Sequence, residues 1–151
     1  MQWTRLLADN QLLGVMSNDG RGLFRGCYWG ELTRHGVIDI DQGSKYHNSQ
    51  ELAELNYKFA AVGLTLVPFQ SSNSGGWHLY YFLDDWAQSQ EICSTIKAWL
   101  LAHGYEIKSG TLEVFPSGNA LRLPLQQGFA WLGHDGRVVR TREQFTQEEA
   151  I

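Results

Sequence analysis

The sequence predicts an α+β protein in which a mixed or antiparallel sheet is flanked by helices. Three observations support this fold class. Hydrophobic residues make up 43% of the 151 residues and charged residues only 19%, a composition typical of folded domains. Short runs rich in aromatic and β-branched residues recur along the chain, and two longer segments between them have helical signals instead. Strands and helices in this order favour a sheet with helices packed on it.

The length suits one domain, so we expect residues 1–151 to form either a minimal core or a domain excised from a longer protein. The two cysteines, Cys27 and Cys93, are far apart and lack the CxxC spacing of a zinc site. No apolar run approaches the roughly 20 residues that span a membrane, and the N-terminus does not resemble a signal peptide. These features predict a cytoplasmic protein with reduced thiols and no membrane partner.

The first half of the chain is expected to be largely β. A short apolar run, Leu12–Met16, ends in a Ser-Asn-Asp-Gly turn. A helix capped by Asn48 or Ser49 is expected to extend to about Val62. The strands expected here are, in order, Leu23–Trp29, Gly36–Asp41 and Leu64–Phe69.

The second half is expected to contain a long helix and several short strands. The helix should start at Asp84 or Asp85 and run to about His103, where Gly104 ends it. Gly and Pro turns separate the segments that follow. The expected strands are Trp77–Leu83, Tyr105–Ile107, Thr111–Phe115, Ala120–Leu123, Phe129–Leu132 and Arg137–Arg140.

The C-terminal segment has clear local signals. Asp135-Gly136 predicts a hairpin turn, and Thr141 with Gln144 predicts a capping box for a last helix. In two stretches, from Gly36 to Leu83 and from Trp77 to Leu123, the elements follow one another as β-α-β-β. An RRM-like module has this order, as do many other α+β sheets.

Two acids on the clearest strand, Asp39 and Asp41, are the first candidates for chemistry. Alternation in GVIDID places both carboxylates on one face of an apolar strand, where they repel each other and burial raises their pKa. A divalent cation reverses this penalty, and oxygen ligands suit Mg²⁺ or Mn²⁺. The alternative is a strand end at which both acids reach water.

The segment Ser74-Gly75-Gly76-Trp77-His78 is the second candidate. Glycines let backbone N–H groups approach an anion closely, the serine hydroxyl adds a donor, and a histidine just inside a strand can donate to a phosphate. A flexible hairpin followed by a core histidine is the simpler interpretation. The other histidines lie at expected loop or helix ends and carry less weight.

Glu113 is the third candidate, because an acid on the short apolar strand TLEVF is unusual. An acid on an edge strand that faces solvent has the same pattern. Arg122 lies between two leucines, and it either forms a structural ion pair with Glu113 or reaches a triphosphate.

Taken in order, the segments VIDIDQGS, SNSGGWHLYYF and LEVFPSGNALRLPL resemble the motifs of the archaeo-eukaryotic primase superfamily. That pattern is a strand with two acids, a small-residue segment that leads to a histidine on a strand, and a third acid on a later strand. The Phe-Pro and Leu-Pro-Leu of the last segment are most similar to primase-polymerases of mobile elements. The resemblance spans Gly36 to Leu125 and departs from the pattern at Glu113, where many members have aspartate.

The resemblance implies a primase-polymerase catalytic core and a DNA-directed nucleotidyltransferase that makes or extends primers in replication or repair. Asp39, Asp41 and Glu113 would hold two ions, Mg²⁺ or Mn²⁺, which activate the primer 3′-hydroxyl and stabilise the leaving pyrophosphate. The incoming (d)NTP would contact the residues of the second motif and Arg122. These residues are Ser74, Gly75, Gly76 and His78. Single-stranded DNA template and primer are the implied partners, and a helicase or accessory primase domain would lie outside this chain.

Two other functions fit the same residues. A net charge of −4 and the short chain favour a binding module that holds nucleotide or nucleic acid without turnover. Carboxylates and a histidine also suit a metal-dependent nuclease.

Overall fold

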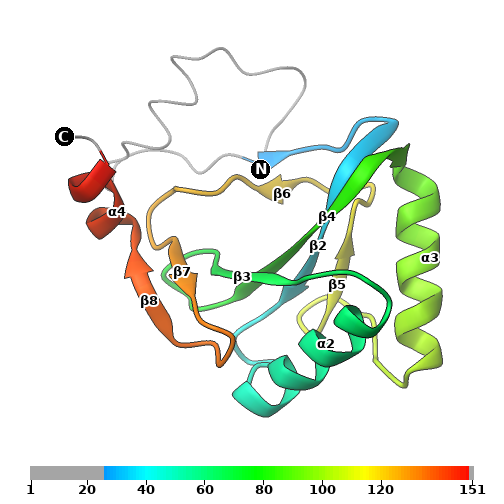
Figure 1. Cartoon of the computed structure of the whole chain (residues 1–151), viewed down its shortest axis with the longest axis horizontal. Helices are drawn as coiled ribbons and strands as arrows, with labels where there is room; N and C mark the ends of the chain where they lie inside the picture. Colours follow the sequence, from blue (N-terminus) through cyan, green and yellow to red (C-terminus); the bar gives the residue numbers. More distant parts are fainter. Residues whose placement is uncertain (1–25, 150–151) are drawn as a thin grey trace.

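A six-stranded antiparallel sheet forms the centre of the protein (Figure 1). The structure is a computed structural model, and it describes residues 26–149. A separate two-stranded ribbon consists of β1 (Gly26–Cys27) and β6 (Leu121–Arg122). In sheet order, the six strands are β5 (Glu113–Phe115), β2 (Leu32–Ile40), β4 (Trp77–Gln88), β3 (Val67–Gln70), β7 (Ala130–Leu132) and β8 (Val138–Thr141). The helices are α2 (Ser49–Ala61), α3 (Ser89–Ala102) and α4 (Arg142–Glu149).

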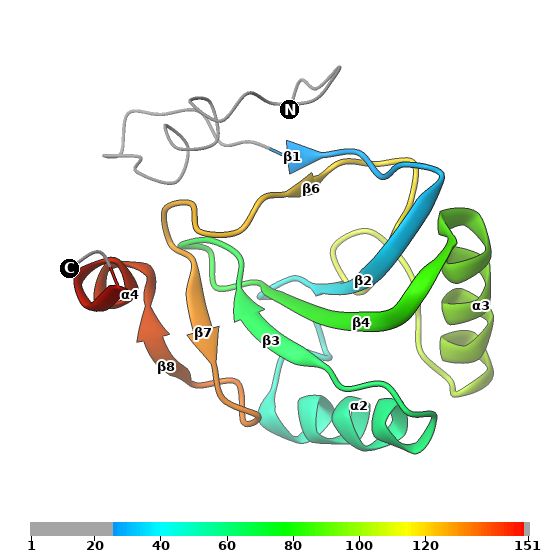
Figure 2. The ribbon, with the colours of Figure 1, turned by 45° about the horizontal axis from the view of Figure 1, so that its top comes forward.

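The two faces of the sheet have different coverings, because successive side chains of a strand point to opposite sides. On one face, Ile38 and Ile40 of β2 and Leu79 and Tyr81 of β4 are fully buried. They belong to the main core with buried residues of α2 and α3. The other face carries a smaller cluster centred on Val37, and this face lies toward the β1–β6 ribbon (Figure 2). The helices therefore leave this second face to the ribbon.

Helix α2 and the start of α4 agree with the sequence signals. Asn48 caps α2, since its side-chain oxygen accepts a hydrogen bond from the Glu51 N–H at 2.9 Å. At α4, the Thr141 N–H donates to Gln144 Oε1 at 2.8 Å and the Gln144 N–H donates to Thr141 Oγ1 at 3.2 Å. The predicted capping box is confirmed, and so is the hairpin that joins β7 to β8.

The predicted start of the long helix at Asp84 or Asp85 is wrong. Strand β4 continues to Gln88, whose partner is Leu32 at the beginning of β2. Helix α3 begins only at Ser89, where the hydroxyl donates to Gly30 O at 2.6 Å and the N–H donates to Glu31 O at 2.8 Å. A partner strand from a distant part of the chain thus overrides the local helical signal.

Other strands are shorter than the sequence indicates. The expected strand at Tyr105–Ile107 is absent, because the Glu106 N–H donates to the hydroxyl of Tyr46 instead of to a neighbouring strand. The strand expected from Leu64 starts at Val67. The run Leu12–Met16 and the beginning of Leu23–Trp29 lie outside the described residues.

The fold class is α+β, as predicted, and the sheet is antiparallel throughout. From β2 to β5 the elements follow the order β-α-β-β-α-β of a split βαβ unit, and β7, β8 and α4 extend this sheet beyond β3. Within residues 26–149, no helix is long and apolar enough to cross a membrane.

We expect Gly36→Ala to lower the free energy of unfolding by about 1–3 kcal/mol, which is the usual cost of overpacking a core. A Cβ on Gly36 would collide with the ring of Tyr81, its fully buried cross-strand partner, and would lie 2.9 Å from the carbonyl oxygen of Phe115. Gly43→Ala is the matched control, because no atom lies within 4 Å of its added Cβ. Urea unfolding of both variants measures the difference, and equal stabilities would contradict the packing argument.

Candidate functional site

The register of three neighbouring strands aligns two acids and a histidine in one row. Asp39 of β2 lies opposite His78 of β4 on one side and opposite Glu113 of β5 on the other. Residues directly opposite each other on antiparallel strands place their side chains on the same face. This face is the one that lies toward the β1–β6 ribbon and away from α2 and α3. Two predicted metal ligands and the predicted phosphate-contacting histidine are therefore brought side by side.

The same row continues across the rest of the sheet. His78 is paired with Phe69, Phe69 with Trp131, and Trp131 with Arg140. The guanidinium carbon of Arg140 lies 4.9 Å from the centre of the Trp131 ring, a cation–π contact. From β5 to β8 the row thus passes from acidic residues through a histidine and two aromatic rings to an arginine.

Asp39 is the most perturbed acid of the row. Its side chain is 19% exposed. Burial, together with the negative charges of Asp41 and Glu113, raises its pKa to about 7. Near neutral pH the carboxyl group is therefore about half protonated, and a cation that binds beside it would displace the proton.

His78 is neutral at physiological pH. Burial, together with the positive charge of Arg122, lowers its pKa to about 4. His78 Nε2 lies 3.6 Å from Asp39 Oδ1, a separation typical of an ion pair. Because the imidazole is neutral near pH 7 and the Asp39 carboxyl is about half ionised, this contact is a polar one and not an ion pair.

Asp41 lies beyond the strand on which the sequence placed it. Pairing of β2 ends at Ile40, and Asp41 starts a turn in which its carbonyl oxygen accepts from the Ser44 N–H at 3.0 Å. Its exposed carboxylate lies near the loop before β5, since a Cβ on Gly110 would be 3.8 Å from Asp41 Oδ2. The strand thus ends one residue earlier than expected, and Asp41 remains close enough to Asp39 for its charge to raise the pKa of Asp39.

The small-residue loop before β4 is held by bonds of its own. The Ser74 hydroxyl bonds to that of Ser72 at 2.8 Å, and the Gly75 N–H donates to Ser72 O at 3.0 Å. Gly75 has a φ of +88°, which favours glycine. Gly76 packs beside Asp41, since a Cβ on Gly76 would lie 3.9 Å from the Asp41 Cα atom. The loop therefore borders the acids, but two of its predicted anion donors already have partners within the loop.

His47 is a site residue to which the sequence assigned little weight. Its Nε2 donates to Gly75 O at 2.7 Å, and its ring stacks on that of Trp77 with 3.9 Å between centres. His47 thereby ties the turn after Asp41 to the loop that precedes His78. The only signal in the sequence was its place in a loop after the first motif.

The β1–β6 ribbon brings Arg122 to the row. Leu121, the neighbour of Arg122, packs with Val37 and Phe115 in the smaller core cluster. Arg122 Nη2 donates to Gln127 O at 3.5 Å, and the guanidinium lies close enough to His78 to lower its pKa. Arg122 is thus placed on the same face as the row, beside the histidine.

Asp41 and Glu113 lie close enough to Asp39 for their charges to raise its pKa, and carboxylate oxygens are ligands that suit a hard divalent cation. Within residues 26–149, however, no three His, Cys, Asp or Glu side chains converge closely enough to hold one ion as they stand. Mutual repulsion of the carboxylates accounts for a spread arrangement of this kind. Asp39 and Glu113 are held in place by strand pairing, whereas Asp41 is in an exposed turn.

A separate cleft of about 630 Å³ lies at the other end of β2 and β4. Its lining includes Trp29, Leu32, Ser89 and Lys97, and neither Asp39 nor His78 takes part. This cleft and the row are therefore different places on the protein. The row is distinguished by its charged side chains and not by a large cavity.

No protein-family model matches the chain, and no curated protein matches it. Among solved structures, the polymerase domain of ligase D from Mycobacterium tuberculosis, determined in complex with DNA, is similar at a TM-score of 0.39 and 17% identity. The match covers 78% of this chain and 48% of that domain, so the chain spans about half the length of that neighbour.

We expect Asp39→Asn to stabilise the metal-free protein at pH 8 and not at pH 4. The pKa of Asp39 is 3.8 when unfolded and about 7 when folded, so wild-type stability falls as the pH rises from 4 through 7. The difference corresponds to at most about 4 kcal/mol at pH 8. Urea unfolding with EDTA between pH 4 and pH 8 measures it.

Asp84→Asn is the control for this series, because Asp84 is exposed at the far end of β4. The free energy of unfolding of Asp39→Asn still depends on pH because of His78, whose pKa is lowered to about 4. That residue contributes in the opposite sense, since stability is lost as the pH falls from 6.5 to 4. A gain from Asp39→Asn that does not change with pH would contradict the raised pKa.

Proposed function

We propose that this chain is the catalytic core of a primase-polymerase of the archaeo-eukaryotic primase type, which joins nucleotides to a 3′-hydroxyl on a DNA template. The observation that carries the proposal is the row of Glu113, Asp39 and His78 on three paired strands. These residues belong to the three motifs of the sequence in their expected order. The pairing of β2 with β4 and β5 brings these three side chains to one face of the sheet.

Asp39, Asp41 and Glu113 would hold Mg²⁺ or Mn²⁺, and a bound ion would supply charge stabilisation for attack on the α-phosphate. Asp39, whose pKa is raised to about 7, would bind such an ion as the deprotonated carboxylate. Neutral His78 donates an N–H hydrogen bond to the triphosphate, and the Arg122 guanidinium adds positive charge beside it.

A binding module without turnover is the second candidate, and a specific observation favours it. The carboxylates do not converge within the described residues, and the Gly75 N–H and the Ser74 hydroxyl are already bonded within their loop. Binding of nucleotide with no synthesis under either metal would favour this candidate.

Metal binding is tested apart from catalysis. We expect Mn²⁺ to raise the midpoint of thermal unfolding at pH 8, because a cation bound only by the folded state stabilises it and relieves the repulsion around Asp39. In Asp39→Asn/Asp41→Asn this shift should disappear. An equal shift in wild type and double variant would remove these acids from the metal site.

Catalysis is tested by primer extension and by de novo synthesis with Mn²⁺ or Mg²⁺. We expect Asp39→Ala/Asp41→Ala to reduce extension by at least about a thousandfold, since loss of the metal removes several kcal/mol of charge stabilisation. Asp84→Ala/Asp85→Ala is the matched control, because it removes two exposed acids at the other end of the same sheet. Synthesis that survives in the Asp39/Asp41 variant would refute the role of these acids, and hydrolysis of labelled DNA by wild type would point to a nuclease instead.

A further inference from the structure

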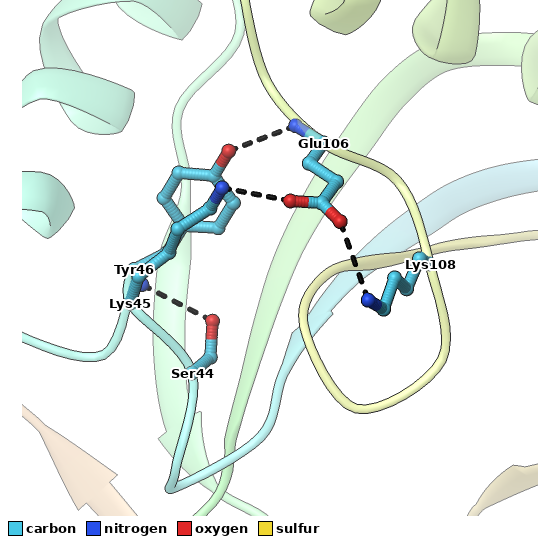
Figure 3. Close-up of polar contacts among 5 residues, drawn as sticks. All are labelled: Ser44, Lys45, Tyr46, Glu106 and Lys108. Carbon is cyan, nitrogen blue, oxygen red and sulfur yellow. Dashed lines mark hydrogen bonds and ion pairs between the residues drawn. The ribbon is translucent and has the colours of Figure 1, made fainter.

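Two lysines from separate loops meet on one glutamate beside the candidate site. Lys45 Nζ lies 2.7 Å from Glu106 Oε2, and Lys108 Nζ lies 3.5 Å from Glu106 Oε1. Figure 3 shows the single carboxylate between the two ammonium groups, one on each oxygen. We call these three residues the lysine cluster.

Tyr46 holds the two loops of the lysine cluster together. Its hydroxyl accepts from the Glu106 N–H at 2.8 Å, and its own N–H donates to Ser44 Oγ at 3.1 Å (Figure 3). The Tyr46 ring is buried and packs on Tyr105 with 5.2 Å between ring centres. The backbones that carry the lysines are thereby fixed relative to each other.

The charge of the lysine cluster is only partly balanced. One carboxylate faces two ammonium groups, so the cluster has a net charge of +1. The side chains of Lys45 and Lys108 are 58% and 66% exposed, which leaves both open to an anion from solvent. The hydrogen bond from Lys45 lowers the pKa of Glu106, so the carboxylate remains charged and keeps the two ammonium groups side by side.

The two loops that carry the lysine cluster meet beside Asp41. Lys45 follows directly after the turn that Asp41 begins, because the Ser44 N–H donates to Asp41 O. Lys108 pairs with Leu112 in a short hairpin that leads into Glu113, and the tip of this hairpin at Gly110 lies beside the Asp41 carboxylate. An anionic strand that approaches the acids is repelled by them, and Lys45 and Lys108 place positive charge on the neighbouring loops.

We propose that Lys45 and Lys108 bind the phosphodiester backbone of single-stranded nucleic acid and guide it past Asp41 toward the row. This inference rests on the proposed function. Two ammonium groups held side by side on an exposed edge supply the positive charge that the phosphates of a strand need for binding. Both groups stand on the surface, outside the buried row where His78 lies, which favours the strand over the triphosphate as their partner.

Binding of a fluorescent single-stranded oligonucleotide, without metal and between about 50 and 200 mM salt, tests the inference. We expect Lys45→Ala/Lys108→Ala to weaken binding about fivefold per lysine at about 0.1 M salt, and to reduce the slope of log affinity against log salt by about 1.4. Arg34→Ala/Lys97→Ala is the control, because it removes the same charge at the opposite end of β2 and from α3. It should have a smaller effect on both quantities.

Glu106→Gln supplies a change in the opposite direction. It removes the negative charge and keeps an oxygen that accepts a hydrogen bond from a lysine, so we expect tighter binding of the oligonucleotide. If the lysine cluster only supports the fold, Glu106→Gln would weaken binding or leave it unchanged. Either result would overturn the inference.

The remaining outcomes separate this inference from the proposed function. An equal loss of affinity in the lysine variant and in its control, or a loss of (d)NTP binding with DNA binding intact, overturns the role of the lysines alone. If wild type extends primers and the lysine variant binds DNA as tightly as wild type does, the role of the lysines is overturned as well. If the wild-type protein neither extends primers nor binds the oligonucleotide, the proposed function fails with it.

Discussion

The antiparallel pairing of β2 with β4 and β5 is the constraint on which the rest of the structure depends. It places Ile38 and Leu79 on the face that packs against the helices, and it places Asp39, His78 and Glu113 on the other. A shift of one residue in this register would exchange the two faces, burying the acids in the main core and exposing its aliphatic residues. Core packing and the charged row are therefore maintained by the same backbone hydrogen bonds.

The electrostatic interactions of this row are unfavourable for the folded state. Asp39 is partly buried near two other carboxylates, which raises its pKa, and its histidine neighbour is neutral and cannot compensate its charge. Unfavourable electrostatics of this kind cluster at functional sites, although structural networks produce them as well. Three features hold the side chains of the row in place: the pairing of both neighbouring strands, the hydrogen bond from His47 to Gly75, and the packing of the ribbon that carries Arg122.

Charge is distributed unevenly around the row, in a way that the net charge of −4 does not reveal. Acids gather at the β5 end, Arg140 lies at the β8 end, and Lys45 and Lys108 stand on the loops next to Asp41. A protein that holds a cation while it binds a polyanion needs such separation, because the same groups cannot attract both. Glu106 contributes by keeping two lysines at one edge.

The sequence by itself determined the α+β class, helix α2 with its Asn48 cap and the capping box of α4. It also identified the acids and the histidine as candidate site residues. Caps, turns and alternation act within a few residues, so the local sequence is enough to predict them. Only the tertiary structure decided the extension of β4 to Gln88, the bridge made by His47 and the meeting of Lys45 with Lys108. Each of these depends on a partner from another part of the chain, which is 28 residues away for His47 and 61 residues away for Lys45. The local sequence pattern identified the candidate residues, and the strand register brought their side chains together.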